Sequence, residues 1–581
     1  MGSFIEVGNA PRDRLRTCHA AGMGAYVEET RGGPGPVAGV PTGTLGMAGI
    51  TAYGPVPHPS NDGQGGGGPV LVTSVTEYQR TYGGLTIDGT ACRLALAAQA
   101  FFANGGQRLY VQRVFVPTPD GVGTGPDGDV AAAELPAGSR RPTLRWVARW
   151  PGTAGSRIRV VTRLSGGEHH RGTRLRGGNA ASHRTLDVEV QLGDRRVVFP
   201  GLGLDPGHPN HVATVLSRAR PADEGSLVWL DLGPAAEEHA HGGLTPGQLL
   251  SALLSPGEQG VQLSGGSDGG ELRPSALTGT AGDPDTSSPA TGLAALAEVD
   301  DVAIVAVPDS TSFPDVDSVA EVVDALIAHC ERDRYRFAVI DPPQTSDIAE
   351  VRAFRSRFDT SFAAMYHPWL QVADPTESTD PSAPGQPPAT LAVPPSGAVA
   401  GILARSDRER GVHVAPANQE VRDIVGLATT LTAAEQGALG PEGVNVLRTV
   451  QGRGHLVWGA RTMSSDPDWR YVSVRRLLIF LERSIDSATG WAVFEPNDEQ
   501  LWHEVRRTVE DFLTSAWRTG ALLGSTPEEA FFVRCDRTTM TQNDLDNGRL
   551  VCLVGVAPTR PAEFLVFRIG QWTADRTVPT P

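Results

Sequence analysis

The chain has 581 residues, a formal net charge of −16 at pH 7, 40% hydrophobic residues and 20% charged residues. This length is too great for one hydrophobic core and predicts about three or four domains. Because nucleic-acid backbones are bound by clustered cationic side chains, the acidic balance argues against a protein whose main partner is DNA or RNA.

The cysteines and the N-terminus indicate the compartment. The cysteines are odd in number and form no C-x-x-C pair, which favours a reducing compartment over a disulfide framework. They are Cys18, Cys92, Cys330, Cys535 and Cys552. The first residues lack the apolar core of a signal peptide, and no apolar run approaches the ~20 residues that span a bilayer. We therefore expect synthesis and folding in the cytoplasm.

Residues 1–50 are expected to form an extended N-terminal arm. Tyr26 and Val27 could begin a short strand, but the closely spaced prolines and glycines that follow them prevent a compact element. A strand is predicted at 46–54, where the arm ends. An extended segment of this kind needs a partner surface on which to settle.

Two further regions follow the arm. Residues 51–118 form the N-terminal part of a folded domain, with a helix at 89–106 and a strand at 108–115. Residues 119–262 have a different sequence pattern and are interpreted as an inserted, mostly β domain on the outer surface. Its β-patterned stretches are 143–164 and 185–201.

Residues 263–395 alternate strands and helices. Three runs are almost continuously apolar, as buried parallel strands are. They lie at 301–308, 336–343 and 361–372. Helical periodicity fills the intervals at 316–333 and 347–358. Strand, helix, strand, helix and strand in this order predict a doubly wound parallel sheet.

Residues 396–572 form a C-terminal core domain, and 573–581 form a tail without a core of its own. Two helices are predicted at 471–485 and 499–520, each with a continuous apolar stripe. Three strands follow, at 530–536, 549–558 and 563–572. The last strand is apolar on both faces and must therefore be covered on both sides. Its apolar residues are Phe564, Leu565, Val566, Phe567 and Ile569.

The sequence offers weak candidates for catalysis. Ser267 lies in a G-x-S-x-G pattern, but a nucleophile elbow needs a helix directly after the serine, and Pro274 follows instead. A loop is the favoured interpretation. His329 and Cys330 adjoin on one helix and point to different sides of it, which favours a core cysteine beside a helix-end histidine over a catalytic dyad.

The acidic clusters are interpreted as solvated turns, because they lack the spaced oxygens and closing glutamate of a calcium loop. Their members are Glu298, Asp300, Asp301, Asp466 and Asp468. No catalytic, cofactor-binding or metal-ligating set is predicted, and we expect no enzyme. Extended ends and a strand with two apolar faces favour the addition of strands to a neighbouring subunit's sheet. The sequence therefore points to self-assembly.

Blocks of sequence resemble a known family in the same order. The strongest blocks are "VPPSGAVAGILARSDRERGVHVAPAN", "GVNVLRTVQGRGHLVWGARTM", "WRYVSVRRLLIFLERSI", "WAVFEPNDEQLW" and "VGVAPTRPAEFLVFRIGQ". Weaker blocks include "GAYVEET", which lacks the proline usual in that family, and "FFANGGQRLYVQRV". The chain is thereby similar to the sheath proteins of contractile phage tails and related contractile injection systems.

The resemblance implies a structural subunit that polymerises as stacked sixfold rings around an inner tube and contracts to drive the tube through a target envelope. It implies a sheath core built from N- and C-terminal parts, a subtilisin-like α/β domain without catalysis, and baseplate and cap partners. It also implies assembly in the cytoplasm of the producing bacterium. The arms that would link subunits contain Tyr26, Val27, Glu28, Phe564, Val566, Phe567 and Ile569.

Two other functions stay open at this point. One is a static shell or surface-layer protein, which would assemble but never shorten. The other is a serine hydrolase that uses Ser267. The resemblance also leaves open whether the particle belongs to a phage or to a cell-encoded injection device.

Overall fold

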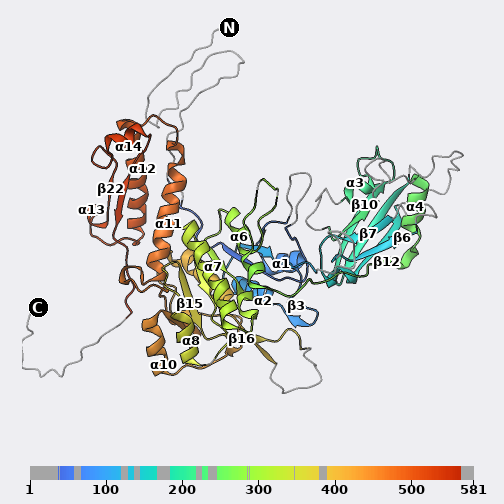
Figure 1. The fold of residues 1–581 in the computed structure, drawn as a ribbon, viewed down its shortest axis with the longest axis horizontal. Coiled ribbons are helices and arrows are strands. Elements are labelled where there is room, and N and C mark those ends of the chain that lie inside the picture. Colours follow the sequence, from blue (N-terminus) through green and yellow to red (C-terminus); the bar gives the residue numbers. More distant parts are fainter. Residues whose placement is uncertain are drawn as a thin grey trace, which may run out of the picture.

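The computed structural model describes residue 37 and residues 39–57, 67–118, 129–136, 144–165, 184–217, 226–232 and 245–563, apart from 284, 287, 346 and 378–388. Figure 1 shows three parts along the long axis. A central body of sheet and helices lies between a β-rich lobe at one end and a helical lobe at the other. The chain is thus a mixed α/β protein with several hydrophobic cores.

The central body is built on one nine-stranded sheet with the order β18-β21-β20-β15-β14-β13-β1-β5-β2. The strands from β20 to β5 run parallel, and antiparallel pairs close both edges. The strands are β1 (Leu45–Gly49), β2 (Val70–Val72), β5 (Leu109–Arg113), β13 (Ile304–Ala306), β14 (Phe337–Ile340), β15 (Ala363–His367), β18 (Gln419–Glu420), β20 (Val444–Val450) and β21 (Gly454–Val457). Strands from the N-terminal, middle and C-terminal regions therefore share one sheet.

Two sequence predictions about this sheet need correction. The three predicted parallel strands are there, but the sheet extends well beyond 263–395 because β1 and β5 add to β13 on one side and β20 adds to β15 on the other. The run at 361–372 is divided into β15 and β16 (Leu370–Ala373), and β16 pairs antiparallel with other strands in a separate small sheet. The apolar pattern correctly marked β15 as buried, but it could not show that the chain turns after β15 or that β16 is only partly buried.

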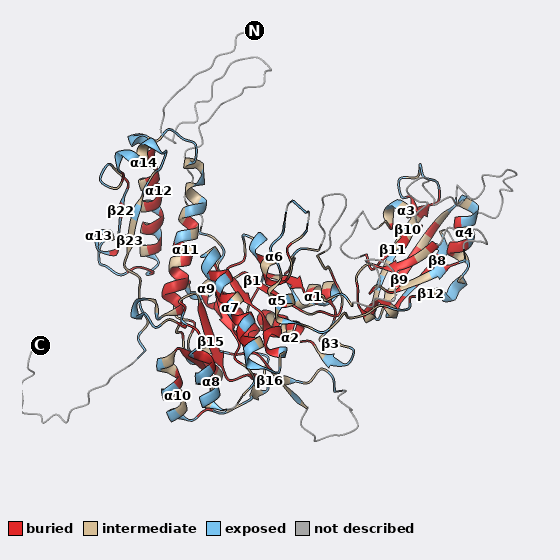
Figure 2. Ribbon diagram, viewed as in Figure 1, coloured by how far each residue is buried: buried red, intermediate tan, exposed pale blue. Residues whose placement is uncertain are grey.

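Helices cover both faces of the central sheet. Ile304, Phe337 and Tyr366 point into a core with α2 (Arg93–Ala103) and α9 (Ser396–Arg410). Their sequence neighbours point to the opposite face, where Val305, Ala338 and Met365 meet α7 (Val316–Asp333) and α8 (Ile348–Arg355). This alternation is the period of a strand with both faces buried. Figure 2 shows the resulting block of buried residues at the centre of the molecule.

Glycine allows α2 and α9 to approach closely. A Cβ atom at Gly397 would lie 2.3 Å from the carbonyl oxygen of Ala97, and one at Gly401 would lie 2.4 Å from that of Phe101. Contacts below 3.0 Å are not tolerated by a Cβ atom against backbone. The small residues near the start of α9 thus let two backbones touch, which explains the sequence "SGAVAGI".

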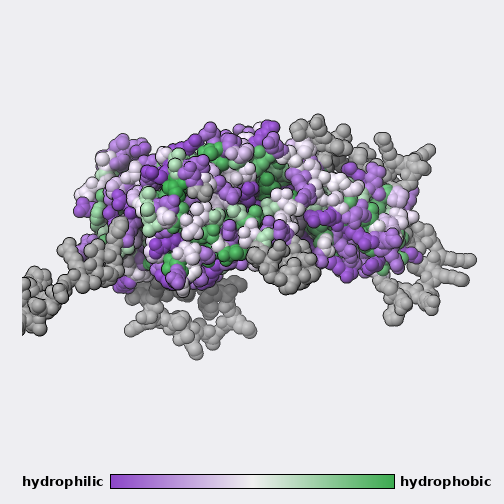
Figure 3. Space-filling view, turned by 90° about the horizontal axis from the view of Figure 1, so that it is seen from below, coloured by the Kyte–Doolittle hydropathy of each residue, from purple (hydrophilic) through white to green (hydrophobic). Residues whose placement is uncertain are grey.

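The β-rich lobe consists of two antiparallel sheets around one core. One sheet contains β6 (Ala132–Leu135), β7 (Leu144–Ala148) and β11 (Val228–Asp231); the other contains β8 (Ile158–Leu164), β9 (Thr185–Leu192), β10 (Arg195–Gly203) and β12 (Val261–Gln262). Trp146, Val188 and Val190 are buried between the sheets, and α4 (Pro246–Leu254) contributes Leu249. On the face seen in Figure 3, the residues of this lobe are mainly hydrophilic. These elements fall within the predicted mostly β region.

The helical lobe contains both helices predicted near the C-terminus. They are α11 (Val472–Thr489) and α12 (Glu499–Arg518). The side chain of Asp498 caps α12 by accepting the amide of Leu501, and Gly520 follows the helix with a φ of +82°. Two of the three predicted strands form a hairpin-like pair on α12. The remaining elements are α13 (Pro527–Ala530), β22 (Phe531–Arg534), α14 (Gln542–Asp546) and β23 (Leu553–Val556).

The other regular elements are short or peripheral. They are α1 (Val75–Tyr82), β3 (Thr86–Ile87), β4 (Thr90–Ala91), α3 (Val212–Val215), α5 (Pro274–Thr278), α6 (Gly292–Ala295), β17 (Thr390–Val393), β19 (Gly426–Leu427) and α10 (Ala433–Leu439).

Candidate assembly interface

The residues predicted to link subunits lie outside the described residues. These are Tyr26, Val27 and Glu28 in the N-terminal arm and Phe564, Val566, Phe567 and Ile569 in the C-terminal strand. What the structure describes is the surface from which each of these segments leaves the folded body. Both exits lie close to α11.

The N-terminal exit lies along α11. The amide of Val40 donates to Ser484 Oγ at 3.2 Å, and Gly39 lies so close to the ring of Phe480 that a Cβ atom would approach Cζ to 2.8 Å. Thr42 Oγ1 donates to Asp407 Oδ2 at 2.7 Å. The segment before β1 is thus fixed to α11 and α9 before it reaches the sheet.

A buried ion pair joins α11 to α9 at this exit. Arg476 Nη2 lies 2.6 Å from Asp407 Oδ2, and the two side chains keep only 5% and 7% of their surface exposed. Arg476 also donates to the carbonyl oxygen of Thr42 at 2.9 Å. Buried charges need such complete pairing because removal from water costs several kcal/mol per ion. The ion pair and this hydrogen bond therefore hold α11, α9 and the segment before β1 together.

The C-terminal exit is fixed by a bidentate contact. Arg461 Nε and Nη2 donate to the two carboxylate oxygens of Glu563 at 2.7 and 2.5 Å, and the hydroxyl of Tyr471 donates to the same carboxylate at 3.3 Å. The hydrogen bond from Arg461 lowers the pKa of Glu563 below its usual value. Upstream, Arg560 donates to Asp468 at 3.0 Å. The chain therefore leaves the body at Glu563 from a defined point.

A basic hollow adjoins this exit. It has a volume of about 540 Å³ and is bordered by Arg352, Arg355, Glu442, Arg461 and Arg470. Glu442 accepts from Arg352 Nε at 2.9 Å, so part of the positive charge is already neutralised. Arg461 is likewise paired with Glu563, so Arg355 and Arg470 are the bordering guanidinium groups left to attract carboxylates.

The strand pair β22–β23 has one covered and one open face. Phe531 and Val533 point toward α12, where they pack with Leu513 and Phe512. On the outer face, Phe532 and Leu553 expose 48% and 50% of their surface. Among the described residues, β22 has no partner strand other than β23. Unpaired backbone beside exposed apolar side chains is a template for strand addition.

His329 and Cys330 have structural roles, as the sequence analysis favoured. Cys330 is fully buried, which raises the pKa of its thiol. Burial, together with the positive charge of Arg336, lowers the pKa of His329 to about 4, and Arg336 Nη1 donates to His329 Nε2 at 2.7 Å. Arg336 also pairs with Asp333 at 3.1 Å.

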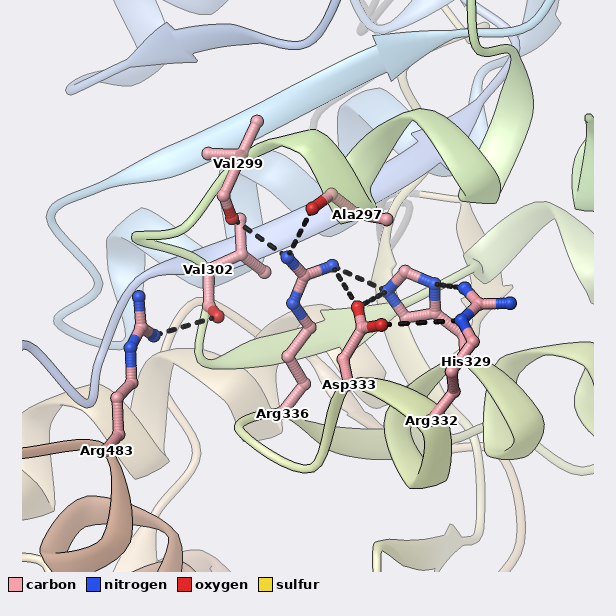
Figure 4. Close-up of polar contacts among 8 residues, drawn as sticks. All are labelled: Ala297, Val299, Val302, His329, Arg332, Asp333, Arg336 and Arg483. Atoms are coloured by element: carbon pink, nitrogen blue, oxygen red, sulfur yellow. Dashed lines mark hydrogen bonds and ion pairs between the residues drawn. The ribbon is translucent and has the colours of Figure 1, made fainter. Parts of the chain in front are cut away.

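Figure 4 shows that this network continues toward α11. Arg336 Nη2 donates to the carbonyl oxygen of Val299 at 2.9 Å, and Arg483 of α11 donates to that of Val302 at 3.4 Å. The same short segment before β13 is therefore bonded from α7 and from α11. The network braces the helical lobe against the body and brings no nucleophile together with a base.

Ser267 lies in a loop and not in a nucleophile elbow. Its hydroxyl accepts the amide of Gly269 at 3.0 Å, a contact within its own turn. The neighbouring Asp268 accepts from Thr153 and so ties this loop to the β-rich lobe. The next helix, α5, begins only at Pro274 and has five residues. The geometry that a catalytic serine requires is therefore missing.

Sequence reasoning missed a second group with hydrolase-like residue types. Asp341 follows β14, His367 ends β15 and Ser396 begins α9, so all three lie near the carboxyl edge of the parallel sheet. Asp341 Oδ1 accepts the amide of Ser396 at 2.9 Å, and burial raises the pKa of Asp341 to about 7. Within the described chain, the two ring nitrogens of His367 and the hydroxyl oxygen of Ser396 have no hydrogen-bond partner. All three are buried, so no substrate could reach them.

The acidic clusters behave as turns. Asp466 Oδ1 accepts the amide of Asp468 at 2.9 Å, and Asp301 pairs with Arg108 at 2.5 Å. The described residues contain no group of three or more acidic, histidine or cysteine side chains placed to hold a metal ion. Among them, too, no helix combines the length and apolar character required to cross a bilayer.

The described residues thus present two fixed chain exits and a two-stranded sheet, β22–β23, that no further described strand extends. Two family models match the chain over half of its length: the phage tail sheath protein central domain at 279–463 and the phage tail sheath C-terminal domain at 464–571. The chain belongs to the phage tail sheath protein family.

Individual relatives agree with this family. The putative prophage major tail sheath protein of Pseudomonas aeruginosa is 25% identical over 269 residues, which cover 44% of this chain and 63% of that protein. The chain thus matches less than two thirds of that relative's length. A chain of the anti-feeding prophage baseplate has the same fold, with a TM-score of 0.52, 21% identity, and coverage of 95% of this chain and 100% of that one. The sheath tail protein Lin1278 of Listeria innocua also has this fold, with a TM-score of 0.54 and 13% identity. The match covers 90% of this chain and 96% of that one.

Proposed function

We propose that this protein is the subunit of a contractile sheath. Copies stack as sixfold rings around an inner tube, and the array shortens to drive the tube through a target envelope. Its partners are further copies of itself, the tube protein, and baseplate and cap proteins. The observation that carries the proposal is the pair of fixed chain exits, together with the strand pair β22–β23, in a chain of the sheath family.

The subunits are linked by exchanged strands. An incoming strand can pair with the edge of β22 that no described strand occupies, and can cover Phe532 and Leu553. The C-terminal segment with Phe564, Val566, Phe567 and Ile569 has two apolar faces, as such a strand needs. Each buried aromatic or aliphatic side chain contributes about 1.5–3 kcal/mol. The N-terminal segment with Tyr26, Val27 and Glu28 provides the second link.

The body serves as a rigid unit during contraction. Its parallel sheet is covered by helices on both faces, in keeping with a doubly wound, subtilisin-like domain that has lost catalysis. Asp341, His367 and Ser396 are buried, and the ring nitrogens of His367 bond to neither of the other two, which supports a role without enzymatic activity. Assembly takes place in the cytoplasm of the producing bacterium, in keeping with a chain whose described cysteines are free.

Particle length tests the function directly. Particles are isolated with their baseplates and imaged by electron microscopy before and after a trigger such as acid or urea. We expect two discrete sheath lengths, the shorter one with the larger diameter. A sheath of constant length would indicate a static shell instead. A Ser267→Ala variant serves as the control, because a hydrolase would lose activity while a sheath would contract normally.

A further inference from the structure

We propose that Cys535 and Cys552 form a dithiol site that small-molecule disulfides oxidise to an intramolecular disulfide. The site lies at the end of β22–β23, opposite the region of the sheet that we propose to receive exchanged strands. The oxidation itself does not depend on the proposed function; only its effect on assembly does.

The strand register places the two cysteines opposite each other. β22 and β23 pair antiparallel from Phe531 with Val556 to Arg534 with Leu553, so one further step brings Cys535 opposite Cys552. The amide of Ala557 donates to the carbonyl oxygen of Ala530 at 2.9 Å, which marks that pair as hydrogen-bonded. Counting five steps makes the cysteines a non-hydrogen-bonded pair, where Cα atoms lie about 4.5 Å apart and side chains are closest. Disulfides accept Cα separations of about 4.4–6.8 Å.

Both thiols also lie on the covered face of the strand pair. Alternate residues of a strand share one face, so Cys535 continues the inner row of Phe531 and Val533. Cys535 is buried in a cluster with Trp502 and Val505 of α12, and Cys552 packs against the same cluster from the other strand. Neighbouring side chains thus hold the two sulfur atoms toward each other.

The two thiols are unequal in reactivity. The contact with Cys552, together with burial, raises the pKa of Cys535. Cys552 is also the more exposed of the two. Since the thiolate is the attacking species, Cys552 is the first to react. Cys92 and Cys330 differ, because each is buried and burial raises the pKa of each thiol.

The reaction is a double thiol–disulfide exchange. The Cys552 thiolate attacks one sulfur atom of oxidised glutathione, and one glutathione leaves as a thiolate. Cys535 then loses its proton and attacks the sulfur atom of Cys552, and the second glutathione leaves. Two protein thiols are oxidised, one glutathione disulfide is reduced to two thiols, and two protons pass to solvent or to the departing thiolates.

The new bond closes the loop 536–551, which contains α14. It ties the end of β22 to the start of β23 and holds both against α12. Cross-linking restricts the unfolded chain, so the helical lobe becomes more resistant to heat. Under the proposed function, a particle that has left a reducing cytoplasm acquires a more rigid acceptor sheet.

The test uses the full chain with Cys18→Ser, because Cys18 lies outside the described residues. The protein is incubated with oxidised glutathione, blocked with a maleimide, and digested for mass spectrometry. We expect a Cys535–Cys552 linked peptide two hydrogens lighter than the reduced pair, and an unfolding temperature several degrees above that of the reduced protein. Cys92→Ser is the matched control and should leave both results unchanged.

The variants Cys535→Ser and Cys552→Ser should abolish the linked peptide and the temperature shift. Because Cys552 reacts first, Cys535→Ser should retain one bound glutathione. A protein in which Cys535 and Cys552 remain reduced, or in which they link different subunits, would overturn the proposal. Electron microscopy of the same sample separates the disulfide proposal from the proposed sheath function. If the particles contract but the disulfide does not form, only the disulfide proposal is refuted. If the disulfide forms but the chains never assemble, only the sheath function is refuted.

Discussion

Arg461 holds Glu563 in a bidentate contact at the last described residue of the chain, so the C-terminal segment leaves the body from a fixed position. The contact is partly open to solvent, with 15% and 25% of the two side chains exposed. Ion pairs in contact with water contribute only about 0–1 kcal/mol to folding. The contact therefore chiefly sets the direction in which the C-terminal segment leaves the body.

We predict that Glu563→Gln weakens assembly more than folding. The glutamine amide cannot form the charge-assisted pair with Arg461, so the C-terminal segment leaves the body in many directions. It therefore loses more conformational entropy when it binds a neighbouring subunit. The unfolding free energy should fall by no more than about 1 kcal/mol. The concentration required for polymerisation, followed by light scattering, should rise several-fold. Arg357→Gln, which breaks an exposed pair with Asp317 of α7 that takes no part in fixing the exit, is the control.

The buried pair of Arg476 and Asp407 should behave in the opposite manner. Asp407→Asn leaves a buried guanidinium without its charge partner and should cost about 3–5 kcal/mol in unfolding free energy. The double variant Arg476→Met with Asp407→Leu removes both charges and should recover much of this loss. Chemical denaturation of all three proteins checks the prediction, and equal losses in the single and double variants would contradict it.

The glycines of α9 provide a packing test. Gly401→Ala forces a Cβ atom against the backbone of Phe101, and overpacking of this kind typically costs about 1–3 kcal/mol. Gly437 of α10 has open space where a Cβ atom would lie. Gly437→Ala should therefore stabilise by about 0.5–1 kcal/mol through the helix propensity of alanine. Thermal unfolding should move in opposite directions for the two variants.

Asp341 predicts a dependence of stability on pH. Its pKa is about 7 in the folded protein because of burial, against an ordinary value of 3.8. Between these values the folded state binds a proton that the unfolded state has released, so the unfolding free energy falls as pH rises from about 4 to 7. Asp309, whose pKa burial raises to about 6, contributes in the same direction.

Asp341→Asn isolates this contribution, because the amide oxygen can still accept the amide of Ser396. The unfolding free energy of the variant should decline less steeply than that of the parent protein between pH 4 and 7. Relative to the parent, the unfolding free energy of the variant should therefore be most favourable at pH 8. Urea unfolding at pH 4.5, 6 and 8 measures the difference. Parallel pH profiles for parent and variant would show that Asp341 ionises normally.

Periodicity was sufficient for the elements with strong apolar patterns. The stripes of α11 and α12 and the alternating faces of β13, β14 and β15 follow from the sequence alone. Sequence patterns could not show that β1 lies inside the sheet between β13 and β5, because its five residues look like the end of a glycine-rich arm. Long-range pairing decided its place.

The candidate interface was predicted only in outline. The apolar residues from Phe564 to Ile569 indicated an exchanged strand, but local patterns do not identify the groups that anchor it. Arg461 is separated from Glu563 by 102 residues, and Asp407 from Thr42 by 365. The buried Asp341 and Ser396 were missed for the same reason, since only the fold brings a strand end to a helix start.

The central claim is that the C-terminal segment joins subunits, and electron microscopy of the purified protein tests it most directly. The full chain and a variant lacking 564–581 are purified in parallel and imaged at equal concentration, with circular dichroism to confirm that both are folded. We predict stacked rings or tubes for the full chain and dispersed, folded subunits for the shortened one. Tubes of equal length and number from the shortened chain would contradict the account.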